Sequence, residues 1–328
     1  MEQNVYIQEN KRVLFIGLAC VDLFQILQSY PIEDMGHRCI ESYWQRGGNA
    51  GNSATVFAIL GGLAEYFGTL AIDKELQFIQ QDFQENNVVT QNCVLIDKAT
   101  CPLSVVIISL GSQSRTVLHT NKNLPELTIK HFQQKILQPN LSPTSLQYGW
   151  IHFEGRDNAC EIAQMIRLIR DYNIKNQSEN RSFKPIIVSL EAEKLRLSAE
   201  LIKYDMWKLP DVMFISKDFA KSEGFLSMAD AMQGFFPRMK EEAVLICAWG
   251  EEGAAAISAR TGMVFSDVYK PQTVVDTCGA GDTFLSATIL ALTKGRPLKE
   301  CITFGCQVAG AKCGMQGFQK LKEKHFQV

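Results

Sequence analysis

The chain has 328 residues, 46% of them hydrophobic and 21% charged, and its 33 basic side chains nearly balance 35 acidic ones. This length is enough for a substantial buried core in one large domain or two unequal ones. The net charge of −2 gives no basic surface field, and no apolar stretch approaches the roughly 20 residues of a membrane span, so we expect neither nucleic acid nor a membrane as a partner.

The cysteines and the N-terminal segment both favour the cytoplasm. The first apolar run, Val13–Gly17, is too short for a signal peptide. The ten cysteines contain no C-x-x-C pair and no zinc-binding pattern, and four of them (Cys247, Cys301, Cys306 and Cys313) lie inside apolar segments. We therefore expect reduced core thiols in a cytoplasmic protein.

Five short, nearly continuous apolar runs predict strands that are buried on both faces of a sheet. They are Val13–Gly17, Trp150–Phe153, Pro185–Leu190, Val212–Ser216 and Ala243–Trp249. Between the second and the third lies Glu161–Asn173, whose apolar residues fall on one helical stripe. A strand, a helix and a strand in this order predict a right-handed parallel crossover, and its repetition predicts a layered α/β fold.

Two segments predict a smaller sheet beside the main one. Asp22–Gly47 carries few helix signals, and Pro102–Leu110 followed by Arg115–Thr120 is typical of a hairpin. We expect these segments to form a small antiparallel sheet at the mouth of the main sheet, where it would act as a lid or a dimer surface. Ordinary loop decoration is an equally good interpretation of the pattern alone.

Two further segments, Leu137–Gln147 and Asn176–Lys184, are rich in Asn, Ser and Pro. This composition is typical of loops, because such side chains compete with regular backbone hydrogen bonding. We expect both segments to be exposed connections.

The segment Val274–Leu292 (VVDTCGAGDTFLSATILAL) indicates chemistry most clearly. A β-branched run ends at Asp276, a Gly-Ala-Gly turn follows, and a helix then runs to Lys294. Gly279 and Gly281 allow the backbone to turn tightly and to approach a ligand without an intervening Cβ. The free N–H groups at the start of the helix form an anion site, which the helix dipole strengthens.

Asp282 lies inside this positive site. An Asp at a helix N-terminus is most often a cap, and that interpretation stays open. The dipole lowers the pKa of a carboxylate placed there, so it stays ionised. Beside a bound phosphate it can accept a proton from a substrate hydroxyl while the amides stabilise the transferring phosphoryl group. The turn matches neither G-x-x-x-x-G-K-[ST] nor G-x-G-x-x-G, so the common nucleotide fingerprints do not apply.

Residues 276–284 (DTCGAGDTF) resemble the C-terminal signature of the ribokinase-like, or phosphofructokinase-B, carbohydrate and nucleoside kinases. The N-terminal signature of that family is similar to residues 46–52 (RGGNAGN). Further matches point to its ketohexokinase branch; they are YWQR at 43–46, RTVLH at 115–119, WIHFEGR at 150–156, ISKD at 215–218, CAW at 247–249, FGCQVAG at 304–310 and KCG at 312–314. Together the matches extend from about residue 13 to 318.

This resemblance implies a ribokinase-like three-layer α/β/α fold with a mainly parallel central sheet and a small antiparallel β lid, called a β-clasp in that branch. It implies one domain over residues 1–328, with the lid formed from about 20–47 and 102–120. The implied activity is that of an ATP-dependent ketohexokinase, which phosphorylates the 1-hydroxyl of D-fructose to give fructose 1-phosphate and ADP. Another ketose, ribose or a nucleoside is the alternative acceptor.

The resemblance also implies roles for single residues around the transferred phosphate. Asp282 matches the catalytic base, and the amides of Gly279, Ala280 and Gly281 match the anion hole for the γ-phosphate. Arg115 matches a phosphate-contacting arginine, a role that suits its permanent charge and planar fork. Without the match, Arg115 is equally a surface residue of a strand. A regulator that binds ligands without catalysis is disfavoured, because loss of the base is the expected mark of an inactive kinase.

The sugar and the nucleotide are matched by two further sets of residues. The sugar-binding positions are Asp22, Gly48, Asn49 and Asn52; helix capping by the two asparagines and a solvated turn at Asp22 are the alternatives. The nucleotide-side positions are Gly250, Glu251, Glu252 and Gly253 in one loop, with Cys306, Gly310 and Cys313 on a helix over the adenine. Asp34 matches a residue that reaches toward the partner's sugar site, which implies a homodimer through the lid. His152 is a core histidine rather than a catalyst on this view.

The chain departs from the family pattern at its metal motif. Where many relatives carry N-x-x-E, this chain reads Ser216-Lys217-Asp218-Phe219. Mg²⁺ enters with ATP, and either Glu191, Glu193 or Asp218 holds it through water or the ATP itself binds it. K⁺ beside the Gly-Ala-Gly-Asp turn is a second ion that the resemblance implies. The sequence leaves the metal ligands unassigned.

Overall fold

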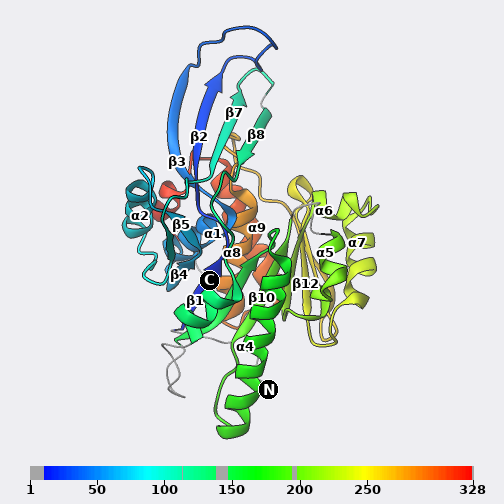
Figure 1. Cartoon of the computed structure of the whole chain (residues 1–328). Helices are drawn as coiled ribbons and strands as arrows, with labels where there is room; N and C mark the ends of the chain where they lie inside the picture. The colour runs from blue at the N-terminus through cyan, green and yellow to red at the C-terminus, as the bar shows by residue number, and fades with distance from the viewer. Residues whose placement is uncertain (1–10, 113, 138–146, 194–197, 327–328) are drawn as a thin grey trace.

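The computed structural model describes residues 11–112, 114–137, 147–193 and 198–326 (Figure 1). The strands of its main sheet are β1 (Arg12–Ile16), β4 (Ala64–Phe67), β9 (Tyr148–Glu154), β10 (Ile187–Ala192), β11 (Val212–Ser216), β12 (Val244–Ala248), β13 (Ala254–Ser258) and β14 (Gly262–Ser266). Within the described residues these eight strands follow the order β14-β13-β12-β11-β10-β9-β1-β4. All pairs from β12 to β4 are parallel, whereas β13 and β14 add an antiparallel edge. The five predicted strands are confirmed within about two residues at each end, the usual uncertainty of such bounds.

Helices cover both faces of this sheet and make three layers. Strand side chains alternate between two buried clusters, with Phe15 in one and Leu14 and Ile16 in the other. The first cluster is covered by α1 (Asn49–Ile59), α2 (Leu76–Glu85), α8 (Ala280–Thr293) and α9 (Leu298–Cys313). The second is covered by α3 (Ile129–Phe132), α4 (Ala159–Glu179), α5 (Ser198–Lys203), α6 (Lys217–Ser222) and α7 (Met228–Phe235). The predicted α/β/α layering is confirmed.

Short turns of tighter or wider helix connect these elements. They are the π-helical η1 (Gln133–Leu137) and the 3₁₀ turns η4 (Met206–Lys208), η5 (Phe236–Arg238), η6 (Gly250–Glu252) and η7 (Gln319–Glu323). Among the described residues, no helix is both long enough and apolar enough to span a bilayer.

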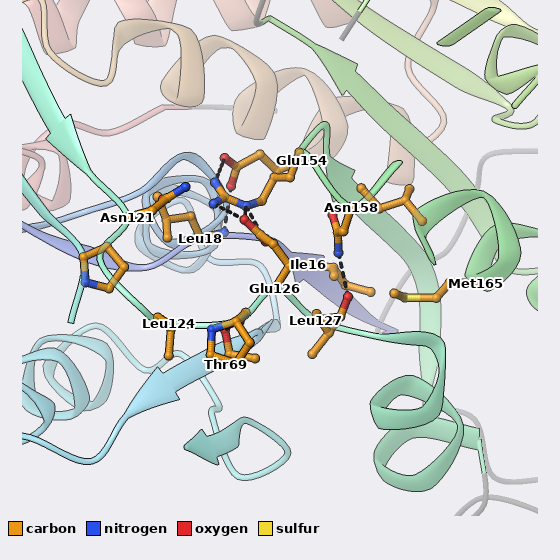
Figure 2. Close-up of a pocket in the computed structure, with 15 residues that line it drawn as sticks. Ile16, Leu18, Thr69, Asn121, Leu124, Glu126, Leu127, Glu154, Asn158 and Met165 are labelled. Atoms are coloured by element: carbon orange, nitrogen blue, oxygen red, sulfur yellow. Dashed lines mark hydrogen bonds and ion pairs between the residues drawn. The ribbon is translucent and has the colours of Figure 1, made fainter. Parts of the chain in front are cut away.

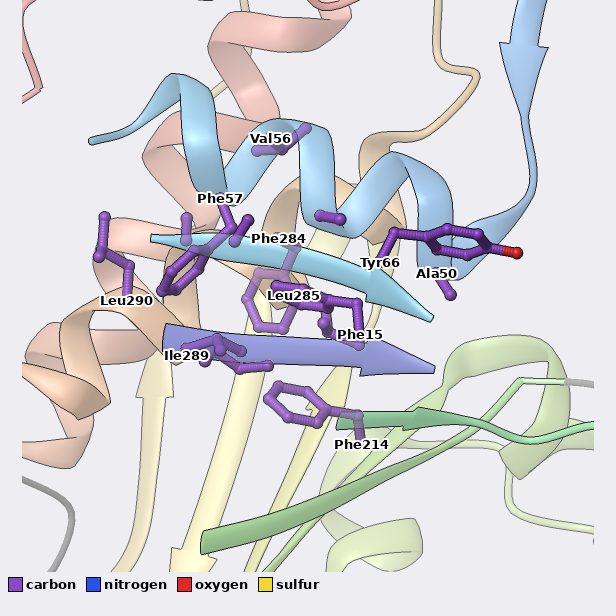
Figure 3. Close-up of a cluster of buried hydrophobic side chains, with 14 of the residues drawn as sticks. Phe15, Ala50, Val56, Phe57, Tyr66, Phe214, Phe284, Leu285, Ile289 and Leu290 are labelled. Atoms are coloured by element: carbon purple, nitrogen blue, oxygen red, sulfur yellow. The ribbon is translucent and has the colours of Figure 1, made fainter. Parts of the chain in front are cut away.

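Helix α8 is the buried helix that carries the Gly-Ala-Gly-Asp turn at its start. Phe284, Leu285 and Ile289 pack with Phe15 of β1 in the first cluster (Figure 3). Three of its buried hydroxyls donate hydrogen bonds to backbone carbonyls one turn earlier, so each of these donors is satisfied. The pairs are Thr283 with Gly279, Ser286 with Asp282 and Thr288 with Phe284. The core therefore fixes where the first turn of α8 points.

A second sheet rises from the carboxyl ends of the main strands (Figure 1). It contains β2 (Cys20–Leu27), β3 (Glu41–Gly47), β7 (Leu103–Ser109) and β8 (Ser114–Thr120) in the order β3-β2-β7-β8. The predicted small sheet is confirmed, and its outer pairs β2–β3 and β7–β8 are antiparallel. The middle pair β2–β7 is parallel, because both strands run outward from the body of the protein. A separate parallel pair joins β5 (Thr69–Ala71) and β6 (Val94–Ile96).

One of the two predicted connections is partly wrong. Helix α4 continues to Glu179, and Asn176 is buried, with its amide donating to the carbonyl of Tyr172 at 2.8 Å. The polar composition of Asn176–Lys184 concealed this last turn, because a side-chain bond to the preceding turn keeps Asn in a helix. Most of Leu137–Gln147 lies outside the described residues.

The cysteines agree with the expectation of reduced thiols. All ten lie in the described part of the chain, and none of them forms a disulfide. Six are buried, including Cys247 and Cys301, and burial raises the pKa of each of these two thiols to about 12. Such thiols stay protonated at neutral pH and act as small apolar side chains.

His152 on β9 is a core residue, as predicted. It is fully buried, its ring lies beside those of Phe15 and Phe214, and its Nδ1 is 2.8 Å from Ser189 Oγ. Burial lowers the pKa of His152 from 6.5 to about 3. The imidazole therefore stays neutral in the folded protein at physiological pH.

This shift predicts a specific loss of stability in mild acid. Below pH 6.5 the unfolded chain takes up a proton on His152 that the folded chain refuses, so the free energy of unfolding falls. Between pH 6.5 and 5 this loss should be about 1.5 kcal/mol for the wild type and absent in His152→Phe, which keeps the ring contacts. Urea unfolding of both proteins at the two pH values measures the difference. Equal losses in the two proteins would refute the assignment.

Candidate active site

A cleft of about 460 Å³ lies between the main sheet and the lid. The carboxyl ends of parallel strands meet at one edge of a sheet, which is where α/β proteins bind ligands. Four such strand ends contribute to the lining, through Glu154, Glu191, Ser216 and Ala248. Most of the other lining residues used below come from the starts of α1 and α8 and from the lid, and Arg156 and Glu193 follow the ends of β9 and β10.

The Gly-Ala-Gly-Asp turn forms one wall of the cleft. Gly279, Ala280, Gly281 and Asp282 all line it. Gly279 is in the left-handed region at φ 76°, and a Cβ there would lie 2.4 Å from the Phe318 ring, so this position requires glycine. A Cβ at Gly281 would meet nothing within 4 Å, which leaves the backbone open on that side. The first turn of α8 therefore faces open space with its N–H end, as an anion site needs.

Asp282 is buried at the foot of this wall. The residue is 7% exposed, and its Oδ2 accepts a hydrogen bond of 2.8 Å from Asn52 Nδ2. The N-cap of α8 is Gly279 rather than Asp282, so Asp282 does not fill the usual capping position. The structure thus brings together two predicted site residues that are 230 positions apart in the sequence.

The predicted sugar-side residues also reach the cleft. Asp22, Gly48, Asn49 and Asn52 line it together. The alternative of helix capping is wrong for both asparagines, because Gly48 is the N-cap of α1 and Asn49 Nδ2 donates instead to Glu193 Oε2 at 2.6 Å. Asp22 is not in a solvated turn either, since it is a buried residue of β2.

Arg115 connects the lid to the phosphate wall. It lies on β8, lines the cleft, and donates from Nη1 to Thr277 Oγ1 at 2.9 Å. Thr277 lies two residues before Gly279, the first residue of the Gly-Ala-Gly turn, so the guanidinium lies beside the predicted anion site. The Arg115 side chain is exposed, as expected of a surface residue on a strand. It also lines the cleft, where it can contact a bound ligand.

Three groups of predicted residues do not line this cleft. Gly250, Glu251, Glu252 and Gly253 form the exposed η6 turn and its end, with Glu251 paired to Lys217. Cys306, Gly310 and Cys313 lie on α9; a Cβ at Gly310 would meet the Tyr269 carbonyl at 1.7 Å, so this helix is closely packed there. Asp34 is exposed in the β2–β3 connection at φ 61°. Their functional roles stay predictions.

A charged cluster at the end of β9 was not singled out from the sequence. Glu154 accepts hydrogen bonds from the backbone N–H of Leu18 (2.8 Å) and Ala50 (3.2 Å) and pairs with Arg156 at 3.0 Å. Arg156 also pairs with both oxygens of Glu126, beside a small cavity of about 20 Å³ (Figure 2). Charged residues directly after a buried strand were the available signal, because such strand ends meet at the ligand edge.

The electrostatics of this cluster hold it together in the low-dielectric interior. Burial by itself would lower the pKa of Arg156, but the carboxylates of Glu154 and Glu126 outweigh that effect and the pKa is raised. The Glu154 carboxylate in turn lies at the N-terminus of α1, where the helix dipole favours negative charge. Glu154 thereby ties the end of β1 to the start of α1.

The described residues contain no group of three or more His, Cys, Asp or Glu side chains arranged to hold a metal ion. Of the three carboxylates considered from the sequence, Glu191 and Glu193 line the cleft and Asp218 does not. Ser216 also lines the cleft, and it is the first residue of the segment that stands in place of the N-x-x-E motif.

Comparison with known proteins identifies the class. Residues 10–324 match the family described as pfkB family carbohydrate kinase. Ketohexokinase from Mus musculus is 38% identical over 310 residues, which cover 94% of this chain and 98% of that protein. Two solved structures share the fold: ribokinase from Giardia lamblia (TM-score 0.73, 14% identity, 95% of this chain and 96% of that one) and adenosine kinase from Sinorhizobium meliloti (TM-score 0.72, 20% identity, 94% and 95%).

The fold is therefore ribokinase-like, and the protein is an ATP-dependent sugar kinase. The chain belongs to the pfkB family of carbohydrate kinases, and its similarity to a ketohexokinase confirms the resemblance that the sequence motifs indicated.

The Glu154 cluster predicts unequal costs for two similar substitutions. Glu154→Gln should lower the free energy of unfolding by about 2–4 kcal/mol, because it removes the charge paired with Arg156 and turns an NH₂ group toward either the buried guanidinium or the two backbone donors. Glu126→Gln should cost only about 1 kcal/mol, because Glu126 is 31% exposed and water can replace it. Urea unfolding of the two variants and the wild type makes the comparison. Equal losses would show that Glu154 does not anchor the site.

Proposed function

We propose that this sugar kinase is a ketohexokinase that phosphorylates the 1-hydroxyl of D-fructose with ATP as the donor. The observation that carries the proposal is the buried carboxylate of Asp282 beside the open N-terminus of α8, in a cleft that also holds Asp22, Asn49 and Asn52. The similarity to a ketohexokinase over nearly the whole chain favours fructose over other acceptors.

In the proposed reaction, Asp282 accepts the proton of the 1-hydroxyl and the sugar oxygen forms a bond to the γ-phosphorus. The bond between that phosphorus and the β–γ bridging oxygen breaks in line, and ADP leaves with the electron pair. The amides of Gly279, Ala280 and Gly281 stabilise the charge on the transferring group. Arg115 adds a permanent positive charge from the lid side of the cleft.

The polar groups on the opposite wall suit a neutral polyol. Asn49 and Asn52 carry amides, which offer donors and acceptors together, and Asp22 offers a carboxylate acceptor. Asn52 Nδ2 already donates to Asp282 at 2.8 Å, so the sugar-side wall and the base are in direct contact. A hydroxyl held by this wall would lie next to the base.

For the nucleotide, the proposal keeps the loop Gly250–Gly253 and the helix carrying Cys306, Gly310 and Cys313. The loop follows β12, whose last residue Ala248 lines the cleft. Burial raises the pKa of the Cys306 and Cys313 thiols, which therefore act as apolar surface rather than as nucleophiles. An adenine ring would find apolar contacts on such a helix.

For the metal, the residues present fit Mg²⁺ that arrives bound to ATP. Mg²⁺ keeps several waters and often uses one or two carboxylates together with substrate phosphates. Glu191 and Glu193, which both line the cleft, would hold it through water. Bound there, Mg²⁺ would neutralise charge on the phosphates. K⁺ beside the Gly-Ala-Gly-Asp turn remains part of the proposal.

The base assignment is tested by Asp282→Asn. The amide keeps the size of the carboxylate but cannot accept the proton, so kcat should fall by about 10²–10⁴ while the Kd for ATP stays within a few-fold. Steady-state kinetics and ATP titration measure the two quantities. A variant that turns over nearly as fast as the wild type would rule out Asp282 as the base.

The acceptor is tested on the wild type. Initial rates with D-fructose, ribose and adenosine at equal concentrations should show a clear preference for fructose, and the product should carry its phosphate on the 1-hydroxyl. A higher kcat/KM for ribose or adenosine would replace the ketohexokinase assignment with another kinase of the same family.

We also propose that the lid makes a homodimer and brings Asp34 to the partner's sugar site. The lid exposes large apolar side chains along its strands and connections, which is unusual for a surface that stays in water. They are Tyr30, Ile32, Met35, Ile40, Trp44, Leu110 and Leu118, each 48–61% exposed.

Sedimentation velocity checks this dimer. The wild type should sediment as a dimer, and Leu118→Glu should move it toward a monomer, because burying a charge in an apolar interface is unfavourable. Ile174→Glu is the matched control, since Ile174 is 66% exposed on α4 away from the lid. A monomeric wild type, or equal effects of the two variants, would contradict the proposal.

A further inference from the structure

A fully buried arginine lies behind the sugar-side wall. Arg46, the last but one residue of β3, is 1% exposed and sits within the N-terminal signature without an assigned role. Its Nη1 donates to Asn52 Oδ1 at 2.9 Å, its Nη2 to Thr55 Oγ1 at 2.8 Å and its Nε to Asp82 Oδ1 at 2.6 Å. The guanidinium thus joins a lid strand to α1 and α2.

The contact with Asn52 continues to the base. The same Asn52 amide accepts from Arg46 through Oδ1 and donates through Nδ2 to Asp282 Oδ2, at 2.9 and 2.8 Å. All three side chains are more than nine-tenths buried, so water does not compete freely for these bonds. Arg46, Asn52 and Asp282 form one hydrogen-bonded chain.

The chemistry of the two ends decides how the amide in the middle is turned. A guanidinium offers only donors, and an ionised carboxylate offers only acceptors. An amide between them must present its oxygen to Arg46 and its NH₂ to Asp282; the opposite orientation would place donor against donor and oxygen against oxygen. The Asp282 carboxylate and the Arg46 guanidinium therefore favour the same orientation of Asn52 from its two sides, and Arg46 is the partner that holds the amide oxygen.

The surroundings show that the guanidinium is fitted to this place. A Cβ at Gly51 would lie 2.8 Å from Arg46 Nη1, so glycine at this position of α1 leaves the room that the side chain needs. The Arg46 guanidinium carbon lies 4.9 Å from the centre of the Phe83 ring, which closes the pocket from α2. The side chain is therefore held in one position.

We propose that Arg46 is a positioning residue, which orients the Asn52 amide and through it holds the Asp282 carboxylate in place to accept the substrate proton. The inference rests on the proposed function, because it takes Asp282 as the base. A fast Asp282→Asn variant would overturn that function whatever Arg46 does, whereas the Arg46 variants below are compared with an active wild type.

Arg46→Lys and Arg46→Gln form a matched pair. Both shorten the side chain, but Lys keeps the positive charge and still offers only donors, whereas Gln removes the charge and the donor-only partner of the Asn52 oxygen. Arg46→Gln should lower kcat at least about tenfold, leave the KM for ATP within about threefold, and move the acidic limb of the pH–kcat profile to higher pH. Arg46→Lys keeps a positively charged donor but loses the planar fork, so it should lose less kcat than Arg46→Gln and keep the acidic limb closer to its wild-type position. Equal impairment of both variants, or wild-type behaviour of both, would overturn the proposal.

The pH profile separates positioning from plain stability. The other titratable side chains that line the cleft are unchanged in every variant, so their contributions are common to all the profiles; they are Asp22, Glu154, Glu191, Glu193, Arg115, Arg156, His119, Cys20 and Cys278. Thr55→Val serves as the control, because it removes a different bond of the same guanidinium and does not touch the amide. It should keep the wild-type kcat and profile, and a shift like that of Arg46→Gln would overturn the proposal.

Asn52→Asp decides the matter even if the Arg46 variants fail to fold. The new carboxylate keeps the partner of Arg46 but faces Asp282 with an oxygen instead of a donor. Two adjacent carboxylates share a proton, so the acidic limb should move to higher pH by about one unit or more and kcat should fall. An unchanged profile and an unchanged kcat would show that Asp282 does not need the Asn52 donor. The proposed role of Arg46 in orienting that donor would then be wrong.

Discussion

The hydrogen bond between Asn52 and Asp282 joins the first turns of α1 and α8, and the cleft depends on this meeting of two helix ends. Both helices pack into the same apolar cluster on one face of the sheet, which brings their N-termini to the carboxyl edge of the strands. Two helix dipoles then point their positive ends at one small region. A buried carboxylate is tolerated there, and so is a bound phosphate, because both are negative and both find donors.

The start of α1 is held from two sides by charged groups. Glu154 binds the Ala50 amide from the end of β9, and Arg46 binds Asn52 and Thr55 from the end of β3. Each of these charges is buried and paired, so moving α1 would leave a charge without its partner. The rigidity of the site therefore comes from its supporting charges as much as from the apolar core.

The lid contributes to the cleft and, by proposal, to assembly. It supplies Asp22 and Arg115 to the lining from two different strands. Because β2 and β7 run outward side by side, Asp22 stands near the root of the lid, whereas Arg115 pairs with Ile108 near the outer ends of β7 and β8. The tip of the lid extends away from the body (Figure 1). If this sheet moved, the Asp22 carboxylate on the sugar side and the Arg115 guanidinium on the phosphate side would move with it.

The sequence by itself determined the elements that have a local signal: the buried strands, the Gly-Ala-Gly-Asp turn, and Asp282 at the start of a helix. Their cause is local, since apolar runs, glycine conformations and helix ends act over a few residues. Only the tertiary structure decided which polar groups meet. The bond from Asn52 to Asp282 joins residues 230 positions apart, and the bond from Arg156 to Glu126 joins residues 30 positions apart. The parallel pairing inside the lid depends on strand directions that the fold sets. No periodicity encodes such contacts, because they follow from how the layers pack.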